Sequence, residues 1–95
     1  MINGNVRNSL KLAHWNGGPS YLGKQGRGMD KLETIKEILF LYKIDILGIS
    51  EANIEKDVEN SYINIDGYNI ERSHGNLARL CVYYKNDLKL NIGQK

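Results

Sequence analysis

The sequence predicts an α/β fold in which a parallel strand–helix–strand unit precedes an antiparallel meander. Three observations lead to this prediction: a short β-type segment over residues 10–15, an amphipathic helical pattern over residues 30–43, and a β-rich run that begins at Asp45. After residue 60 the helical spacing gives way to short apolar runs separated by turn residues. We therefore expect one mixed sheet with a helix packed on it.

Composition places the chain among ordinary soluble globular proteins, either as one small domain or as a piece of a larger one. The hydrophobic share is 41%, the charged share is 25%, and the net charge of +2 permits an anionic partner without requiring one. Cys81 is the single cysteine, which excludes an intrachain disulfide and favours a reducing compartment. No apolar run is long enough for a membrane span and no secretory signal opens the sequence, so we expect an intracellular protein, cytoplasmic or nuclear.

The first predicted strand, Leu10–Trp15, follows a polar stretch over residues 1–9 that we expect to be disordered. Residues 16–29 hold five of the chain's ten glycines and its single proline. This composition predicts a loop that tolerates unusual backbone angles. The folded part is therefore expected over residues 10–95.

The predicted helix begins at Asp30, which can cap the first turn, and Glu33 completes a capping-box-like pair. Apolar side chains recur at helical spacing as far as about Lys43, at Leu32, Ile35, Ile38, Leu39 and Tyr42. Asp45 and the apolar residues after it start the next strand at once. Two parallel strands joined by this helix form a right-handed crossover.

The second half of the chain predicts four short strands, Tyr62–Ile65, Tyr68–Arg72, Leu77–Tyr84 and Leu88–Ile92. Asp66-Gly67 is a strong hairpin signal between the first two, and Gly75-Asn76 and Asn86-Asp87 mark the later turns. No closing element follows the last strand. We therefore expect the chain to form part of a domain.

Two polar residues come directly after the apolar parts of the two parallel strands. Asn16 follows Trp15, and Glu51 ends the run that begins at Asp45. The carboxyl ends of parallel strands lie at one edge of a sheet, where ligands usually bind, so we expect these side chains side by side. A carboxylate and a carboxamide offer the oxygen ligands and the amide donor of a magnesium and phosphate site. Each residue alone also has a structural interpretation, Asn16 as a turn cap and Glu51 as a solvated strand terminus.

The glycine-rich loop contains a rival motif. Residues 18–24 satisfy the G-x-x-x-x-G-K pattern of a phosphate-binding loop, and they follow a predicted strand. Gln25 stands where that motif needs Ser or Thr, and a helix that begins at Asp30 begins too late for its amides to face a phosphate. A nucleotide-hydrolysing site therefore ranks third among the functions considered.

Other residues with catalytic chemistry give weaker signals. Ser73 and His74 are adjacent in a predicted hairpin, where neighbouring side chains rarely point at one another. Cys81 lies in an apolar strand, so a core position is expected rather than a nucleophile. Two histidines and one cysteine at irregular spacing give no zinc pattern.

Four segments, in this order, resemble the opening of the endonuclease/exonuclease/phosphatase superfamily, which has the deoxyribonuclease I-like fold. They are LKLAHWNGG, DILGISEANI, IDGYNIER and ARLCVYYKNDL, and the resemblance covers about residues 10–92. It is nearest to the endonuclease domain of non-LTR retrotransposon polyproteins. That domain's first strand ends in a pair like Trp15-Asn16, its second ends in a glutamate like Glu51, and a Gly-Tyr pair like Gly67-Tyr68 follows on a hairpin.

The resemblance implies a four-layer α/β/β/α sandwich of two mixed sheets, of which this chain would supply the N-terminal portion, one sheet and its helix. It implies that Glu51 is a magnesium ligand, with manganese as a possible substitute, and that Asn16 supports both the metal and the phosphate. The implied reaction is metal-dependent hydrolysis of a phosphodiester. DNA is the implied substrate, and the sequence does not separate it from RNA, a phospholipid or a small phosphoester.

The chain also departs from the family pattern. Ile44 stands where a proline usually precedes the aspartate, and Leu77 and Ala78 replace glycines before the later strand. The family's Asp-x-Asn and C-terminal Ser-Asp-His segments, which carry the general base and part of the phosphate clamp, have no counterpart. We therefore expect the N-terminal part of a DNA endonuclease, inactive alone and self-associating without the C-terminal half of its domain. The alternative is a non-catalytic α/β binding module on the same scaffold.

Overall fold

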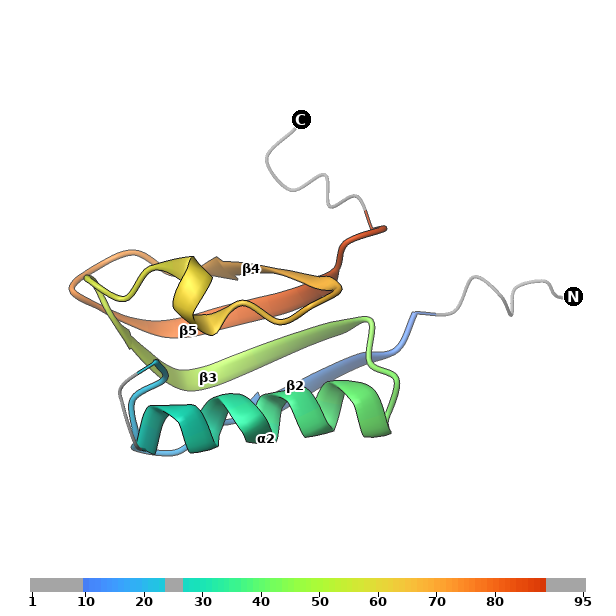
Figure 1. Ribbon diagram of the computed structural model, residues 1–95, viewed down its shortest axis with the longest axis horizontal. Coiled ribbons are helices and arrows are strands. Elements are labelled where there is room, and N and C mark those ends of the chain that lie inside the picture. The colour runs from blue at the N-terminus through green and yellow to red at the C-terminus, as the bar shows by residue number, and fades with distance from the viewer. Residues whose placement is uncertain (1–9, 24–26, 89–95) are drawn as a thin grey trace, which may run out of the picture.

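The computed structural model describes residues 10–23 and 27–88, which form a sheet and a helix in two layers (Figure 1). The elements in chain order are β2 (Leu12–Asn16), α2 (Arg27–Leu41), β3 (Ile46–Glu55), the 3₁₀ helix η1 (Asn60–Ile63), β4 (Tyr68–Arg72) and β5 (Leu77–Lys85). The predicted α/β class, the strand–helix–strand unit and the β4–β5 pair are confirmed.

The sheet is mixed and has the strand order β2-β3-β5-β4. β2 and β3 are parallel, with Leu12 opposite Ile46 and Asn16 opposite Ser50. β5 is antiparallel to both β3 and β4. The two parallel strands therefore send their carboxyl ends to the same end of the sheet, as the sequence predicts.

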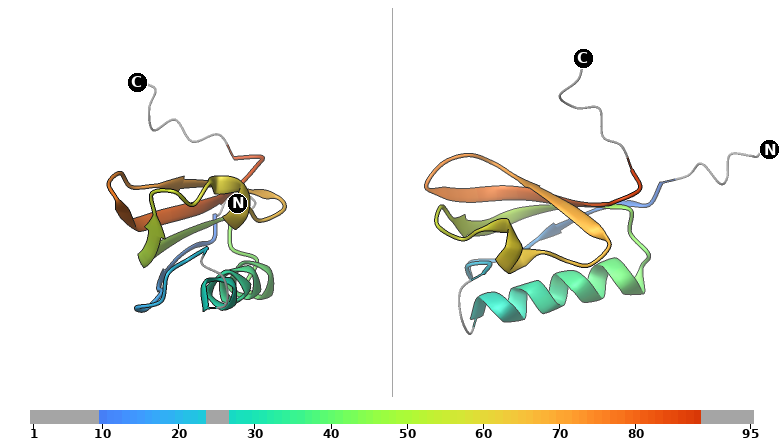
Figure 2. Two further views of the ribbon diagram at one scale, coloured as in Figure 1. Left: turned by 60° about the vertical axis from the view of Figure 1, so that its left-hand side comes forward. Right: turned by 45° about the horizontal axis from the view of Figure 1, so that its top comes forward.

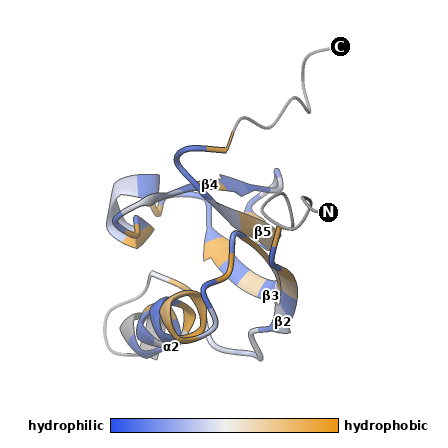
Figure 3. Cartoon of the chain, turned by 90° about the vertical axis from the view of Figure 1, so that its right-hand side faces the viewer, coloured by the Kyte–Doolittle hydropathy of each residue, from blue (hydrophilic) through white to orange (hydrophobic). Residues whose placement is uncertain are grey.

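The core lies between α2 and one face of the sheet (Figure 2). Figure 3 shows the hydrophobic side of α2 turned toward the strands. The side chains at the centre of this layer are all buried, and they include Leu32, Ile35, Leu39, Leu47, Ile49, Cys81 and Tyr83. Burial raises the pKa of the Cys81 thiol to about 12, so this thiol stays protonated at neutral pH. The predicted core role of Cys81 is confirmed.

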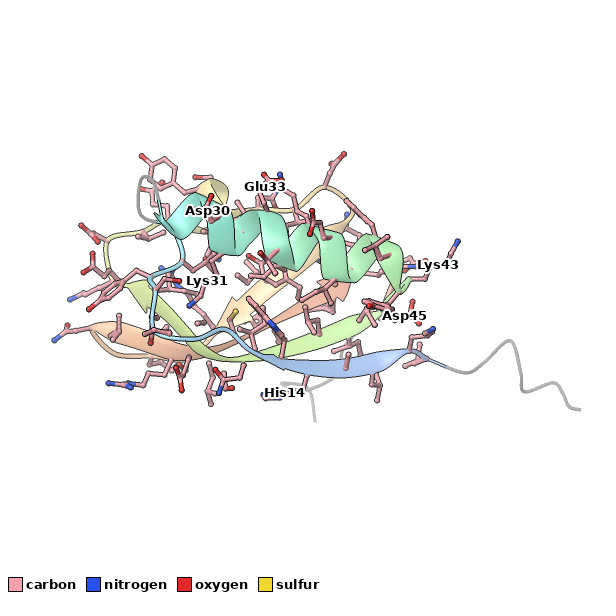
Figure 4. The ribbon with its side chains drawn as sticks, turned by 90° about the horizontal axis from the view of Figure 1, so that it is seen from below. His14, Asp30, Lys31, Glu33, Lys43 and Asp45 are labelled. Atoms are coloured by element: carbon pink, nitrogen blue, oxygen red, sulfur yellow. The ribbon has the colours of Figure 1, made fainter. Side chains whose placement is uncertain are left out.

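The other face of the sheet carries no second layer within residues 10–23 and 27–88. Leu12 is 66% exposed and Leu80 is 57% exposed on that face. His14 points away from the helix on the same side (Figure 4). The described residues thus form one sheet and its helix, while the four-layer sandwich remains an implication of the resemblance.

The helix boundaries differ from the prediction. α2 begins at Arg27, so Asp30 lies inside its first turn rather than at the cap. There the negative charge still interacts favourably with the helix dipole. The helix ends at Leu41, and Lys43 has a φ of 52°, the left-handed conformation that commonly follows a helix.

The strand predicted over Tyr62–Ile65 was wrong, because η1 occupies the first half of that segment and no strand follows before β4. Ile63 and Ile65 alternate as in a strand and are 0% and 1% exposed, but they pack on the core from a connection that has no strand beside it. The turn at Asp66-Gly67 is present, with Gly67 at a φ of 89°, and it leads into β4 rather than closing a hairpin. The last predicted strand falls almost entirely on residues 89–95 and the expected disorder on residues 1–9, all outside the described residues.

Candidate active site

The carboxyl ends of β2 and β3, the start of α2 and the turn between β4 and β5 gather at one end of the molecule (Figure 1, left). Asn16 is the last residue of β2, and Glu51 follows the Ser50 that pairs with it. The Asn16 Nδ2 atom donates a long hydrogen bond to Oε2 of Glu51, at 3.5 Å. The structure therefore brings together the two site residues that the sequence selects.

The side chain of Asn16 is oriented by its own loop. Its Oδ1 atom accepts the backbone N–H of Gly18 at 2.9 Å, which is an Asx turn. The N–H of Gly17 donates to the carbonyl oxygen of Ser50 at 2.8 Å and extends the parallel ladder by one bond. With Oδ1 turned to the loop, Nδ2 is directed at Glu51, so the turn-cap interpretation of Asn16 is confirmed and is compatible with its contact to Glu51.

Glu51 is not the end of its strand. β3 continues to Glu55 through a bulge in which three residues, 51–53, lie opposite Arg79 alone. Glu51 and Asn53 have φ values of 54° and 55°, a left-handed conformation that costs a non-glycine residue about 1 kcal/mol or more. The expectation of a simple strand terminus was therefore wrong. The bulge turns the Glu51 side chain into solvent while the next residue, Ala52, is fully buried.

A buried lysine holds the bulge and the glycine-rich loop together. Lys31 is 4% exposed, and its Nζ atom donates to the carbonyl oxygens of Gly18 at 3.1 Å, of Glu51 at 2.8 Å, and of Ser20. Figure 4 shows Lys31 directed from α2 toward the sheet while Asp30 points outward. Burial lowers the pKa of Lys31, and the nearby negative charge of Glu51 opposes this shift. Carbonyl dipoles and this carboxylate together offset the cost of burying the ammonium group.

Asn53 makes a second set of contacts to the same loop. Its Nδ2 atom lies within hydrogen-bonding distance of the carbonyl oxygens of Gly18, Pro19 and Ser20, at 3.3, 3.4 and 3.3 Å. Because the loop directs its carbonyl oxygens inward at Lys31 and Asn53, it presents the opposite polarity to a phosphate-binding loop, whose amides face the ligand. This geometry opposes the nucleotide-binding interpretation. Residues 24–26 of that motif lie outside the described residues.

Neither Lys31 nor Asn53 was among the site residues predicted from the sequence. Lys31 stands four residues before Ile35 and eight before Leu39, so helical spacing places it on the apolar face of α2. A charge on that face, next to a glycine-rich loop, was the available signal. The signal for Asn53 was weaker. It is a polar residue between Ala52 and Ile54, and all three residues are buried.

No protein-family model, curated protein or solved structure matches this chain. The resemblance to the endonuclease/exonuclease/phosphatase superfamily therefore rests on the sequence segments quoted above. In the described part of the chain, no three His, Cys, Asp or Glu side chains gather as a metal-binding group. No helix there is long and apolar enough to cross a membrane.

Proposed function

We propose that this chain forms the N-terminal part of a magnesium-dependent phosphodiesterase, a DNA endonuclease of the retrotransposon type. The carrying observation is the Glu51 carboxylate, which a strained bulge holds in solvent beside the amide of Asn16. It forms no ion pair with any residue in the described ranges. Strained backbone clusters at functional sites, and the carboxyl edge of parallel strands is where α/β proteins bind ligands.

The residues at this edge fit a hydrated magnesium ion. Magnesium keeps several water ligands and takes one or two protein carboxylates. Glu51 would supply the carboxylate, and the Asn16 Oδ1 atom has a second lone pair besides the one that accepts the Gly18 N–H. A bound magnesium ion would stabilise negative charge that develops on a phosphodiester and lower the pKa of a water molecule.

The protein's own residues supply position and charge. Asn16 orients Oε2 of Glu51 through Nδ2, and Lys31 ties the bulge that carries Glu51 to the loop that follows Asn16. These contacts fix the distance between the Asn16 and Glu51 side chains. A site that positions one phosphate group requires such a fixed distance. The general base belongs to segments that have no counterpart in these 95 residues. Activity is therefore to be tested in the protein encoded by the full reading frame.

Two experiments test this proposal. Magnesium titrated into the ¹⁵N-labelled chain should shift the amide resonances of residues 16–18 and 50–53 to saturation, and Glu51→Gln should abolish these shifts. In the full-length protein, Glu51→Gln should slow magnesium-dependent nicking of plasmid DNA by about 100-fold or more, while the fold is retained.

Glu71→Gln is the matched control, because Glu71 is an exposed glutamate on β4. It should leave both the resonance shifts and the nicking rate unchanged. If Glu51→Gln nicks DNA as fast as the parent at the same magnesium concentration, the proposal is wrong. Binding of DNA with no nicking by the parent would instead support the non-catalytic binding module.

A further inference from the structure

A second polar site lies at the turn between β4 and β5. A cavity of about 370 Å³ opens there between the turn and the end of β3. Its polar lining comes from Lys56, Arg72, Ser73 and His74, and its floor from Ile54 and Ala78. The volume equals that of about twelve water molecules, so the cavity admits a small polyatomic ion together with water.

Arg72 is one of the two cations that line this cavity, with Lys56. It is the last residue of β4, it is half-buried, and it pairs with Cys81, whose side chain is buried in the core. Its Nη1 atom is buried and has no hydrogen-bond partner in the described residues. Arg72 also takes part in none of the ion pairs found there. Buried donors are almost always paired in folded proteins, so a buried Nη1 atom without a partner among the described residues points to an acceptor that those residues do not supply.

The other polar groups of the cavity are donors as well. The N–H of Lys56 donates to the carbonyl oxygen of Asn76 at 2.9 Å, which anchors the residue after β3 to the β4–β5 turn. The Ser73 Oγ atom accepts the N–H of Leu80 at 3.3 Å, so its hydroxyl proton remains available for donation. His74 also lines the cavity, and an imidazole has an N–H that can donate. Within the described ranges, no carboxylate lines the cavity.

We propose that this cavity is a binding site for one phosphate group. Arg72 and Lys56 supply positive charge, and Ser73 and His74 supply hydrogen bonds from the turn. A phosphate dianion or a phosphodiester anion suits this set, because it accepts several hydrogen bonds and compensates two cations at once. The site contains neither Asn16 nor Glu51, so it stands independently of the proposed phosphodiesterase activity. The β4–β5 turn that lines this cavity and the carboxyl ends of β2 and β3 lie at the same end of the sheet (Figure 1).

Nuclear magnetic resonance titration without magnesium tests the site. Inorganic phosphate and, separately, a short DNA duplex are added to the ¹⁵N-labelled chain. We expect saturable shifts at the amides of residues 56 and 72–76. Each of Lys56→Met and Arg72→Met should weaken binding by about tenfold, because each removes one charge-assisted contact. Saturation by phosphate identifies a free anion as a ligand, and saturation by the duplex alone identifies the nucleic-acid backbone.

Controls separate this result from unfolding and from the Glu51 site. Lys56 is exposed, so Lys56→Met tests the site even if the half-buried Arg72 proves necessary for folding. Lys43→Met removes an exposed charge at the other end of the sheet and should bind as the parent does. Glu51→Gln should also bind phosphate normally, whatever it does to magnesium. Absence of shifts with both ligands, or equal affinity for Lys56→Met and Lys43→Met, would overturn the proposal.

Discussion

Each end of the sheet carries a carboxylate, and the two carboxylates differ in how the protein compensates their charge. At one end, Asp45 accepts the N–H of Lys11 at 2.8 Å and pairs with the ammonium of Lys85 at 3.3 Å. At the other end, Glu51 receives one long hydrogen bond, from Asn16, among the described residues. The Lys11 N–H, with Lys85, lowers the pKa of Asp45. A carboxylate that the protein itself compensates is structural, whereas one left in solvent beside a single amide is available to a ligand.

The regularity of the backbone also differs between the two ends of the sheet. Near Asp45 the parallel and antiparallel ladders are in regular register, and the Tyr68 hydroxyl closes the end by donating to the carbonyl oxygen of Ile44 at 2.7 Å. Near Glu51 the register of the β3–β5 ladder shifts, and Glu51 and Asn53 adopt left-handed angles. The buried Lys31 donates to the carbonyl oxygen of Glu51 in this bulge. Within the strands, the irregular backbone is therefore concentrated where the open Glu51 carboxylate lies, whereas the left-handed Lys43 near Asp45 follows the end of α2.

The largest expected effect comes from removing the charge that stabilises the irregular end. Lys31→Met keeps the length of the side chain but leaves the carbonyl oxygens of Gly18, Ser20 and Glu51 without their donor. Buried groups that lose a partner cost about 1–3 kcal/mol each, so we expect the free energy of unfolding to fall by about 3 kcal/mol. Urea denaturation measures this difference. Lys36→Met, at a more exposed position on the same helix, should change stability by less than about 0.5 kcal/mol. Equal free energies of unfolding for Lys31→Met and Lys36→Met would show that Lys31 does not stabilise this end of the sheet.

The next effect concerns the amide beside the open carboxylate. Asn16→Ala removes the donor to Glu51 and the acceptor of the Gly18 N–H. We expect magnesium binding to weaken without disappearing, and plasmid nicking by the full-length protein to slow by about tenfold. Asn69→Ala, at an exposed asparagine of β4, is the control. A rate as low as that of Glu51→Gln would mean that Asn16 is itself an essential ligand rather than an orienting residue.

At the other end of the sheet, the prediction concerns Asp45 and how the free energy of unfolding depends on pH. Because the folded protein lowers the pKa of Asp45, this residue stabilises the fold above the ordinary aspartate pKa of about 4, and the contribution disappears as the pH falls through the lowered value. Asp45→Asn should lower the free energy of unfolding by about 1 kcal/mol at neutral pH. The gap to the parent should narrow as the pH falls below the ordinary aspartate pKa. Asp87→Asn, in an exposed turn, is the control and should change the free energy of unfolding at neutral pH by less than about 0.5 kcal/mol.

The smallest expected effect concerns the sheet face away from α2. Leu12 and Leu80 are largely exposed on it, and exposed apolar faces favour association, so we expect the isolated chain to self-associate. Leu80→Lys should raise the dissociation constant of the associated form by about threefold in sedimentation experiments while the melting temperature changes little. Tyr62→Lys, at an equally exposed aromatic residue of η1, should not. A monomeric parent at high concentration would contradict the prediction.

The sequence predicted those features that depend on local pattern. Period-two and helical spacing gave the parallel unit, and parallel strands alone place Asn16 near Glu51. No local pattern predicted the bulge in β3. Ala52, Asn53 and Ile54 are buried in succession, and in the sequence they resemble the interior of a continuous strand. The role of Lys31 depends on carbonyl groups that are remote in the sequence, which no local pattern encodes. For η1 the burial of Ile63 was predictable from its spacing, but the absence of a neighbouring strand follows from the path of the chain.

The Lys31 contacts also determine when the site can form during folding. One ammonium group joins segments near residues 18, 31 and 51, and an added methyl group on Gly17 would lie 3.0 Å from Cε of Lys31 and 3.2 Å from the carbonyl oxygen of Glu51. These three segments meet only after α2 has docked on the sheet. The pairing of Asn16 with Glu51 is therefore expected to be a late event, absent from a peptide that contains β2 and its loop alone. Amide exchange at Gly17 and Leu22 should then occur through the same cooperative opening as the centre of β3.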